Sequence, residues 1–189
     1  MTGVPSPAAA ELLNALQRAK GTVTEFLEHL AGEPIDADIL SQNTGPAGND
    51  NSLGLESDAE LVRRIVLLTG FVYAESAIAV ERLPASARQR LKSSRDPIGR
   101  VLTKHRLEVG REPLAGPEIS VGTSTWIIDL LDGAVHSRCY LMTLGGDPAI
   151  VVSEWFLQTV TEALTSHTAS SVGPNDSPWQ SMEREGEAH

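Results

Sequence analysis

Helical spacing of apolar residues characterises the beginning of this chain of 189 residues. The run PAAAELLNALQRAK (7–20) starts with a first-turn proline and is stopped by Gly21. In the next run, TVTEFLEHLAG, Thr22 is followed three residues later by Glu25, the spacing of a capping box, and the run is stopped by Gly32. Because these are start and stop signals of helices, the pattern predicts two short helices.

Runs rich in β-branched and apolar residues dominate from position 60 onward and predict strands. ELVRRIVLL (60–68) and FVYAESAIAV (71–80) flank Thr69-Gly70 in the layout of a hairpin. HSRCYLMTL (136–144) and AIVVSEWFL (149–157) likewise flank a Gly-rich turn. With a further candidate strand over 35–42, and additional segments between the two hairpins, the pattern predicts an α+β domain. Its antiparallel sheet would have about six strands and its helices would lie on one face.

Two segments between these elements predict the start of a further helix and a long loop. In RDPIGRVL (95–102), Asp96 stands as a capping residue before the first-turn proline Pro97, which predicts the start of a short helix. The segment TGPAGNDNSLG (44–54) is a Gly/Asn-rich loop, which acts either as a flexible cover or as a plain linker.

Length and polarity predict the domain organisation. A chain of this length forms about one domain with its own core. The segment 166–189 is polar and has no periodicity, so ordering it would cost more entropy than its burial returns. We therefore expect one domain over 1–165 and a flexible C-terminal tail over 166–189.

Composition argues against several classes of function. The net charge of −10 and an aromatic content of 4% disfavour nucleic-acid partners. No window approaches 18 uninterrupted apolar residues and the start lacks a secretion signal, so we expect neither a membrane partner nor export. The single Cys139 fits a reducing cytoplasm. No metal-ligand spacing and no GxSxG, P-loop or HExxH motif occurs, so neither a metal site nor the chemistry of these motifs is expected.

Charged residues inside apolar strands are the candidates for chemistry. Arg63 and Glu154 lie within two such runs, and burying either of them without a partner would be costly. One interpretation is that they lie at a sheet face or edge and cover apolar surface. The other is a binding cavity between the sheet and the helices. Because side chains alternate along a strand, Arg63 and Arg64 point to opposite faces, and at most one of them easily enters such a cavity.

Four segments, RRIVLL, FVYAESAIAVERLP, RDPIGRVL and GGDPAIVVSEWF, follow one another between about Gly21 and Leu157. In this order and spacing they resemble the chorismate pyruvate-lyase family, especially its actinobacterial branch that forms 4-hydroxybenzoate. The resemblance implies a small antiparallel sheet with flanking helices, shared with ligand-sensing domains of some transcription regulators. It also implies elimination of pyruvate from chorismate without a cofactor, for secondary metabolism or for the supply of lipid or quinone precursors.

The resemblance implies roles for individual residues as well. Arg63 would hold a substrate carboxylate, and Glu154 would lie beside the other functional groups of the substrate; these are the expected catalytic residues. The expected substrate-binding residues are Val23, Ile98, Gly99 and Arg138. At Gly99 the missing side chain would let backbone N–H groups of a helix N-terminus approach an anion.

Two alternatives stay open at this point. One is an enzyme of the same fold that acts on a different chorismate-like substrate, which the fold alone does not exclude. The other is a non-catalytic sensor of aromatic acids, which would be accompanied by an upstream DNA-reading winged helix. The residues before the predicted sheet carry few basic groups, which disfavours the sensor.

Overall fold

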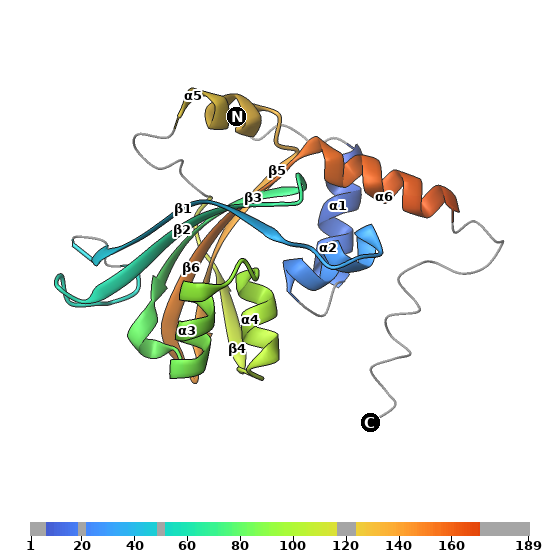
Figure 1. Ribbon diagram of the computed structural model, residues 1–189. Coiled ribbons are helices and arrows are strands. Elements are labelled where there is room, and N and C mark those ends of the chain that lie inside the picture. The colour runs from blue at the N-terminus through green and yellow to red at the C-terminus, as the bar shows by residue number, and fades with distance from the viewer. Residues whose placement is uncertain (1–6, 19–21, 49–51, 117–123, 171–189) are drawn as a thin grey trace.

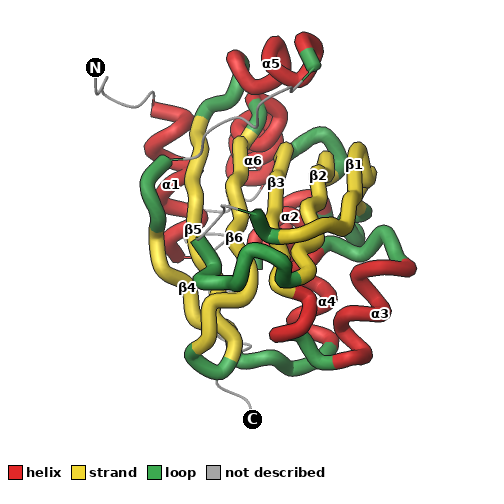
Figure 2. The backbone as a smooth tube through the Cα atoms, turned by 90° about the vertical axis from the view of Figure 1, so that its left-hand side faces the viewer, coloured by secondary structure: helices red, strands yellow, loops and turns green. Residues whose placement is uncertain are grey.

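An open antiparallel sheet forms the centre of the molecule. The computed structural model describes residues 7–18, 22–48, 52–116 and 124–170, and within them the strand order is β1-β2-β3-β6-β5-β4 (Figure 2). The strands are β1 (Ala37–Pro46), β2 (Glu60–Leu68), β3 (Val72–Ala79), β4 (Val109–Pro113), β5 (His136–Leu144) and β6 (Asp147–Phe156). The predicted α+β class with a sheet of about six antiparallel strands is confirmed.

Helices cover mainly one face of this sheet (Figure 1). They are α1 (Pro7–Arg18), α2 (Val23–Ala31), α3 (Ala85–Ser93), α4 (Ile98–Lys104), α5 (Thr125–Asp132) and α6 (Gln158–Ser170), with a 3-10 turn over Val80–Arg82. Residues of α1, α2 and α6 form one apolar cluster with one end of the sheet, and residues of α3 and α4 form a second cluster farther along it. The two clusters leave the middle of this face to the residues that line a cavity.

Helix α5 departs from the predicted arrangement. Its buried residues Ile127 and Leu131 pack against Tyr73 and Trp155, whose side chains point away from the other helices. The prediction that the helices are segregated to one face is therefore wrong for α5. A short apolar segment such as WIIDLL has no pattern that says which face of a sheet it will cover.

The start of α2 follows its sequence signal. The Thr22 side chain accepts a hydrogen bond from the backbone N–H of Glu25, and the Glu25 carboxylate accepts one of 2.7 Å from the backbone N–H of Thr22. Gly32 ends the helix with φ of 71°, a conformation that favours glycine. The capping box thus fixes the position of the first turn of α2, which reaches the cavity.

The start of α4 differs from the prediction. Pro97, and not Asp96, is the residue that precedes the first helical turn, and no side chain caps this end. The Asp96 carboxylate instead accepts hydrogen bonds from Arg90 on α3 and from Arg100 on α4. Burial alone would raise the pKa of Asp96, but the hydrogen bond from Arg90, the Lys104 charge and the contacts with Arg100 outweigh it and lower the pKa. Asp96 therefore joins two helices by ion pairs and does not cap one.

Arg100 extends this network from α4 to α2. Its guanidinium pairs with Glu28 on α2 and donates a hydrogen bond of 2.6 Å to the backbone carbonyl of Ile35. The hydrogen bond with Glu28 is the main reason that the pKa of Arg100 is raised. These contacts hold α2 and α4 side by side across the open side of the sheet.

Two of the expected boundaries differ in the structure. Helix α6 continues to Ser170, so the expected division between 165 and 166 falls inside a helix, and residues 171–189 of the expected tail lie outside the described residues. Strand β1 includes the first three residues of the expected loop over 44–54.

None of the helices within the described ranges combines the length and the apolarity that crossing a membrane requires.

Candidate active site

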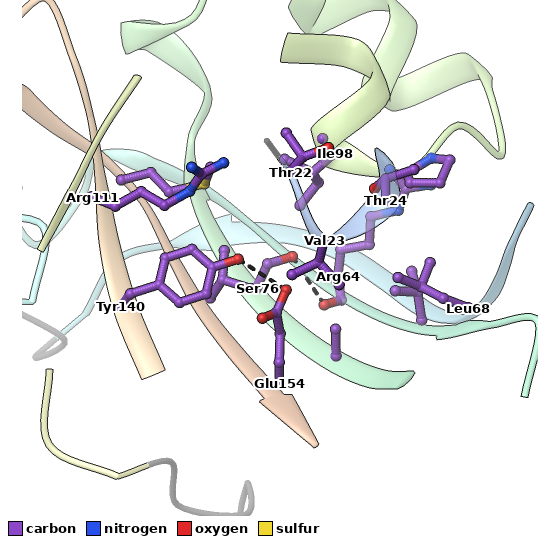
Figure 3. A pocket seen from close by; sticks show the side chains of 16 residues that line it. Thr22, Val23, Thr24, Arg64, Leu68, Ser76, Ile98, Arg111, Tyr140 and Glu154 are labelled. Atoms are coloured by element: carbon purple, nitrogen blue, oxygen red, sulfur yellow. Dashed lines mark hydrogen bonds between the residues drawn. The ribbon is translucent and has the colours of Figure 1, made fainter. Parts of the chain in front are cut away.

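A cavity lies between the sheet and the first turns of α2 and α4 (Figure 3). Side chains from five strands form its floor and the two helix starts form its roof. The lining residues are Thr22, Val23, Thr24, Arg64, Val66, Leu68, Ala74, Ser76, Pro97, Ile98, Gly99, Arg111, Tyr140, Met142, Val152 and Glu154. A mostly apolar lining with a few polar groups is typical of sites for small organic molecules.

Arg64 on β2 is the most unusual group in this lining. Only 1% of the residue is exposed, and its Nη2 donates a hydrogen bond of 3.3 Å to the backbone carbonyl of Ser94. Its Nε and Nη1 are buried and have no hydrogen-bond partner among the described residues. Burial lowers the pKa of Arg64. The nearby negative charge of Asp96 acts in the opposite direction but is the smaller effect on this pKa. Since unpaired buried donors on a cation are costly, this arrangement favours an anionic ligand that supplies the missing acceptors.

Arg63 does not enter the cavity. Its guanidinium lies on the opposite face of the sheet, where it donates hydrogen bonds to the backbone carbonyls of Pro46 (3.4 Å) and Ala47 (3.2 Å). Consecutive side chains of a strand point to opposite faces, so placing Arg64 inside necessarily places Arg63 outside. The expectation that Arg63 shares a cavity with Glu154 is therefore corrected: the arginine in that position is Arg64.

Glu154 on β6 is 4% exposed and is held by two neighbours on β5. Its Oε2 accepts a hydrogen bond of 2.8 Å from Nε of Arg138, the residue directly opposite in the sheet, and its Oε1 accepts one of 2.9 Å from the hydroxyl of Tyr140. Figure 3 shows the Tyr140 hydroxyl and the Glu154 carboxylate pointing toward one another. Two donors on two oxygens fix the orientation of this carboxylate before any ligand arrives.

The two residues that donate hydrogen bonds to Glu154, Arg138 and Tyr140, both have raised pKa values. Burial would lower the pKa of Arg138, but the charge of Glu154 and their hydrogen bond outweigh it, so this pKa is raised. The Arg138 guanidinium also lies 5.1 Å from the ring centre of Tyr140 and 5.5 Å from that of Phe156. Burial and the charge of Glu154 raise the pKa of Tyr140 well above its ordinary value. Both groups therefore keep their protons over the whole physiological pH range.

Gly99 lets the starts of α2 and α4 come close together. A Cβ at this position would lie 2.8 Å from Cβ and Oγ1 of Thr22 and 2.8 Å from Oγ1 of Thr24. The missing side chain thus serves the contact between two helices, whereas the sequence suggested an approach of the backbone to an anion. Val23, Ile98 and Gly99 nevertheless all line the cavity, as expected of substrate-binding residues.

Gly99→Ala is expected to lower the free energy of unfolding by about 1–3 kcal/mol, because the Cβ of Thr22 cannot yield without moving the backbone at the start of α2. Chemical denaturation of the purified protein measures this. Gly45→Ala is the matched control, since a Cβ there meets no atom within 4 Å. Equal stability of the two variants would contradict the importance of this contact.

The structure brings most of the expected site residues together. Val23, Ile98, Gly99 and Glu154 line the cavity, Arg138 reaches it through Glu154, and Arg63 lies elsewhere. The sequence analysis did not assign roles to Arg64, Tyr140 or Arg111. Within the described ranges, no three His, Cys, Asp or Glu side chains gather as a metal site would need.

Comparison with known proteins places this cavity in a family. A family model described as "Chorismate pyruvate-lyase Rv2949c-like" matches residues 18–164, which contain every residue of the cavity lining. The chain belongs to this family. The resemblance carried by the four sequence segments is thereby confirmed, and membership of the chorismate pyruvate-lyase family makes the chain one of a family of lyases.

Individual relatives agree with this assignment. The chorismate pyruvate-lyase of Mycobacterium tuberculosis H37Rv is 31% identical over 169 positions, covering 78% of this chain and 80% of that protein. The chorismate pyruvate-lyase of Mycobacterium leprae is 29% identical over 160 positions, covering 78% and 75%.

Solved structures of regulator domains are similar at a more distant level. The effector domain of PhnF from Mycobacterium smegmatis has a TM-score of 0.47 at 12% identity, covering 75% of this chain and 91% of that one. The ligand-binding domain of a putative GntR-family regulator from Bordetella bronchiseptica has a TM-score of 0.44 at 17% identity, covering 66% and 84%.

Proposed function

We propose that this protein eliminates pyruvate from chorismate and releases 4-hydroxybenzoate. The observation that carries the proposal is the buried Arg64, which has two guanidinium nitrogens without a partner among the described residues and lines a cavity together with the fixed carboxylate of Glu154. Membership of the chorismate pyruvate-lyase family supports the choice of substrate. The product would serve secondary metabolism or supply lipid or quinone precursors in the cytoplasm.

The spacing of the polar groups favours the 4-hydroxy isomer. Arg64 lies on β2 and Glu154 on β6, with β3 between them, so their backbones are about 10 Å apart at the usual strand spacing. The lining between them is apolar and comes from Val66, Ala74 and Val152. A ring with its carboxylate and hydroxyl at opposite ends fits this pattern. A ring with the two groups on neighbouring carbons would leave one of the two charged side chains without a partner.

The proposed reaction conserves all atoms of chorismate. The bond between the ring carbon and the ether oxygen breaks, and its electron pair leaves with the enolpyruvyl oxygen. The neighbouring ring carbon, which carries the hydroxyl, loses its proton, and the electrons of that C–H bond complete the aromatic ring. The proton ends on the methylene carbon of the leaving group, which becomes the methyl group of pyruvate. The reaction as written needs no metal or cofactor.

The chain contributes position and charge to this reaction. Arg64 binds the ring carboxylate through its two unpaired nitrogens, and this contact fixes one end of the substrate. Glu154, held by Arg138 and Tyr140, accepts a hydrogen bond from the ring hydroxyl at the other end. With both ends fixed, the carbon that loses its proton and the carbon that loses the ether oxygen lie at a defined place in the cavity.

The roof of the cavity has to adjust when substrate enters. The cavity encloses about 50 Å³, whereas pockets for small molecules are typically about 300–1,000 Å³. The floor belongs to paired strands, while the roof consists of the first turns of two short helices. Movement of these helix starts away from the sheet is therefore the expected response to a ring-sized ligand.

A direct assay tests the proposal. Purified protein is incubated with chorismate, and pyruvate and the hydroxybenzoate isomers are quantified by chromatography. Equal amounts of pyruvate and 4-hydroxybenzoate are expected. A different isomer or a different product would indicate the same fold acting on another chemistry, and binding of 4-hydroxybenzoate without turnover of chorismate would indicate an aromatic-acid sensor.

A further inference from the structure

Arg111 lies at the outer end of the cavity, on the strand farthest from Arg64 in this part of the sheet. It belongs to β4 and stands directly opposite Met142 of β5, whose side chain lines the cavity floor. Arg111 and Thr22 line both the cavity and an adjoining open groove that also includes Glu25 and Thr103. Arg111 is thus placed where the closed part of the site meets solvent.

The charge of Arg111 acts inside the site. The structure shows no hydrogen bond or ion pair between its side chain and another described residue. Burial and Glu154 raise the pKa of the Tyr140 hydroxyl, whereas the charges of Arg138 and Arg111 act in the opposite direction. Figure 3 shows the Arg111 side chain next to Tyr140, on the side that faces the start of α2. The guanidinium is therefore close to the polar group that holds Glu154, and its donors are available for a ligand.

The proposed substrate and product differ by one charge. Chorismate carries a carboxylate on the ring and a second one on the enolpyruvyl group, whereas 4-hydroxybenzoate carries the ring carboxylate alone. Arg64 on β2 accounts for the ring carboxylate, and Arg138 is already paired with Glu154. Among the arginines that line the cavity, Arg111 is then the cation left for the second carboxylate.

The separation of Arg64 and Arg111 across the sheet is compatible with each of them binding one of the two carboxylates. Strands β3, β6 and β5 lie between β2 and β4, so the backbones of Arg64 and Arg111 are about 19 Å apart at the usual strand spacing, and both side chains reach inward. Cations at the two ends of a site match a ligand that carries its two negative charges at its two ends. The ring hydroxyl and the adjoining ether would then lie between them, beside Glu154 and Tyr140.

We infer that Arg111 binds the enolpyruvyl carboxylate and is the residue by which the site distinguishes the doubly charged substrate from the singly charged aromatic product. This inference rests on the proposed function and adds a specificity-determining residue to it. Because Arg111 contacts the departing group and not the ring, it acts on substrate binding and leaves the binding of 4-hydroxybenzoate unchanged.

The test compares two ligands on the same variant. Arg111→Ala is expected to raise KM for chorismate by about 10- to 100-fold, the effect of losing one charge-assisted contact. The dissociation constant of 4-hydroxybenzoate, measured by calorimetry or fluorescence, is expected to change by less than about 3-fold. Arg111→Lys keeps the charge and should recover part of the loss in KM. Arg88→Ala on α3 removes the same charge away from the cavity and serves as the matched control.

Each outcome separates this inference from the proposed function. If the wild-type protein turns over chorismate and Arg111→Ala has an unchanged KM, Arg111 does not bind the second carboxylate. If Arg111→Ala weakens chorismate and 4-hydroxybenzoate equally, the residue holds the ring or the fold and the inference is again overturned. If the wild-type protein neither binds nor turns over chorismate, the proposed function fails, and this inference fails with it.

Discussion

Arg64→Ala is expected to lower kcat/KM for chorismate by about 10²- to 10³-fold, which corresponds to ~3–4 kcal/mol of lost stabilisation. The reason is that its two unpaired buried nitrogens are the donors that would fix the ring carboxylate. Steady-state assays of pyruvate release measure the effect. The binding of 4-hydroxybenzoate should weaken by a similar factor, because this ligand retains the ring carboxylate.

The neighbouring arginine provides a matched control. Arg63→Ala removes the same side chain from the opposite face, where it contacts the carbonyls of Pro46 and Ala47. It should leave kcat/KM within about 3-fold of wild type, because the Arg63 side chain does not line the cavity. Arg64→Met preserves much of the side-chain volume, so a loss of activity in this variant reflects the missing guanidinium and not a packing defect. Normal turnover by both Arg64 variants, or loss of turnover on replacing Arg63 instead, would contradict the assignment.

Arg64 variants are also expected to remain folded. Removing the side chain costs packing, but it also removes a desolvated cation that lacks partners for two of its nitrogens. These effects oppose one another, so the free energy of unfolding should change much less than the free energy of activation. A site that trades stability for ligand binding behaves in this way.

Glu154→Gln is expected to reduce kcat/KM by about 10²- to 10³-fold, the usual range for a group that handles a proton or orients the reacting atoms. The amide can accept from one neighbour, but it no longer balances the charge of Arg138, which is partly buried and lies over the rings of Tyr140 and Phe156. The free energy of unfolding should fall by about 1–3 kcal/mol for the same reason. Kinetic assays and chemical denaturation measure the two effects.

Tyr140→Phe separates the two supports of Glu154. It removes the 2.9 Å hydrogen bond to Oε1 and keeps the Arg138 contact to Oε2, so the loss of activity should be clearly smaller than that of Glu154→Gln. Should the phenylalanine variant be as inactive as the glutamine variant, the hydroxyl of Tyr140 would itself be part of the chemistry. Should both variants be fully active, the carboxylate would have no role in turnover.

Most of the architecture could be predicted from local pattern. The capping box at Thr22, the hairpin around Thr69-Gly70 and the Gly-rich turn before β6 all specify their elements through neighbours in sequence, and the structure contains each of them. Helix α5 was not predicted from the sequence, because this short apolar run is fixed by packing against Tyr73 and Trp155, which lie far away in sequence. Asp96 was assigned to a cap because its partners, Arg90 and Arg100, are recognisable only in three dimensions.

The inward arginine of β2 was predicted one residue away from the position that lines the cavity. Both faces of β2 carry apolar side chains, with Val62 and Val66 on one and Leu61 and Ile65 on the other, so alternation showed that the two arginines diverge but not which of them points inward. The packing of α2, α3, α4 and α6 against the face that carries Val62 and Val66 decides it. Tyr140 was detectable in principle, because it lies two positions after Arg138 and therefore on the same face.

The adjacency of two arginines on β2 has a consequence for how this segment tolerates changes in length. An insertion or deletion of a single residue between the hairpin turn and Arg64 would shift the preceding part of the strand by one position, turn Arg63 toward the cavity face and move Val62 and Arg64 to the opposite face. The number of residues between that turn and Arg64 therefore determines which arginine enters the cavity, whatever the identity of the residues in between.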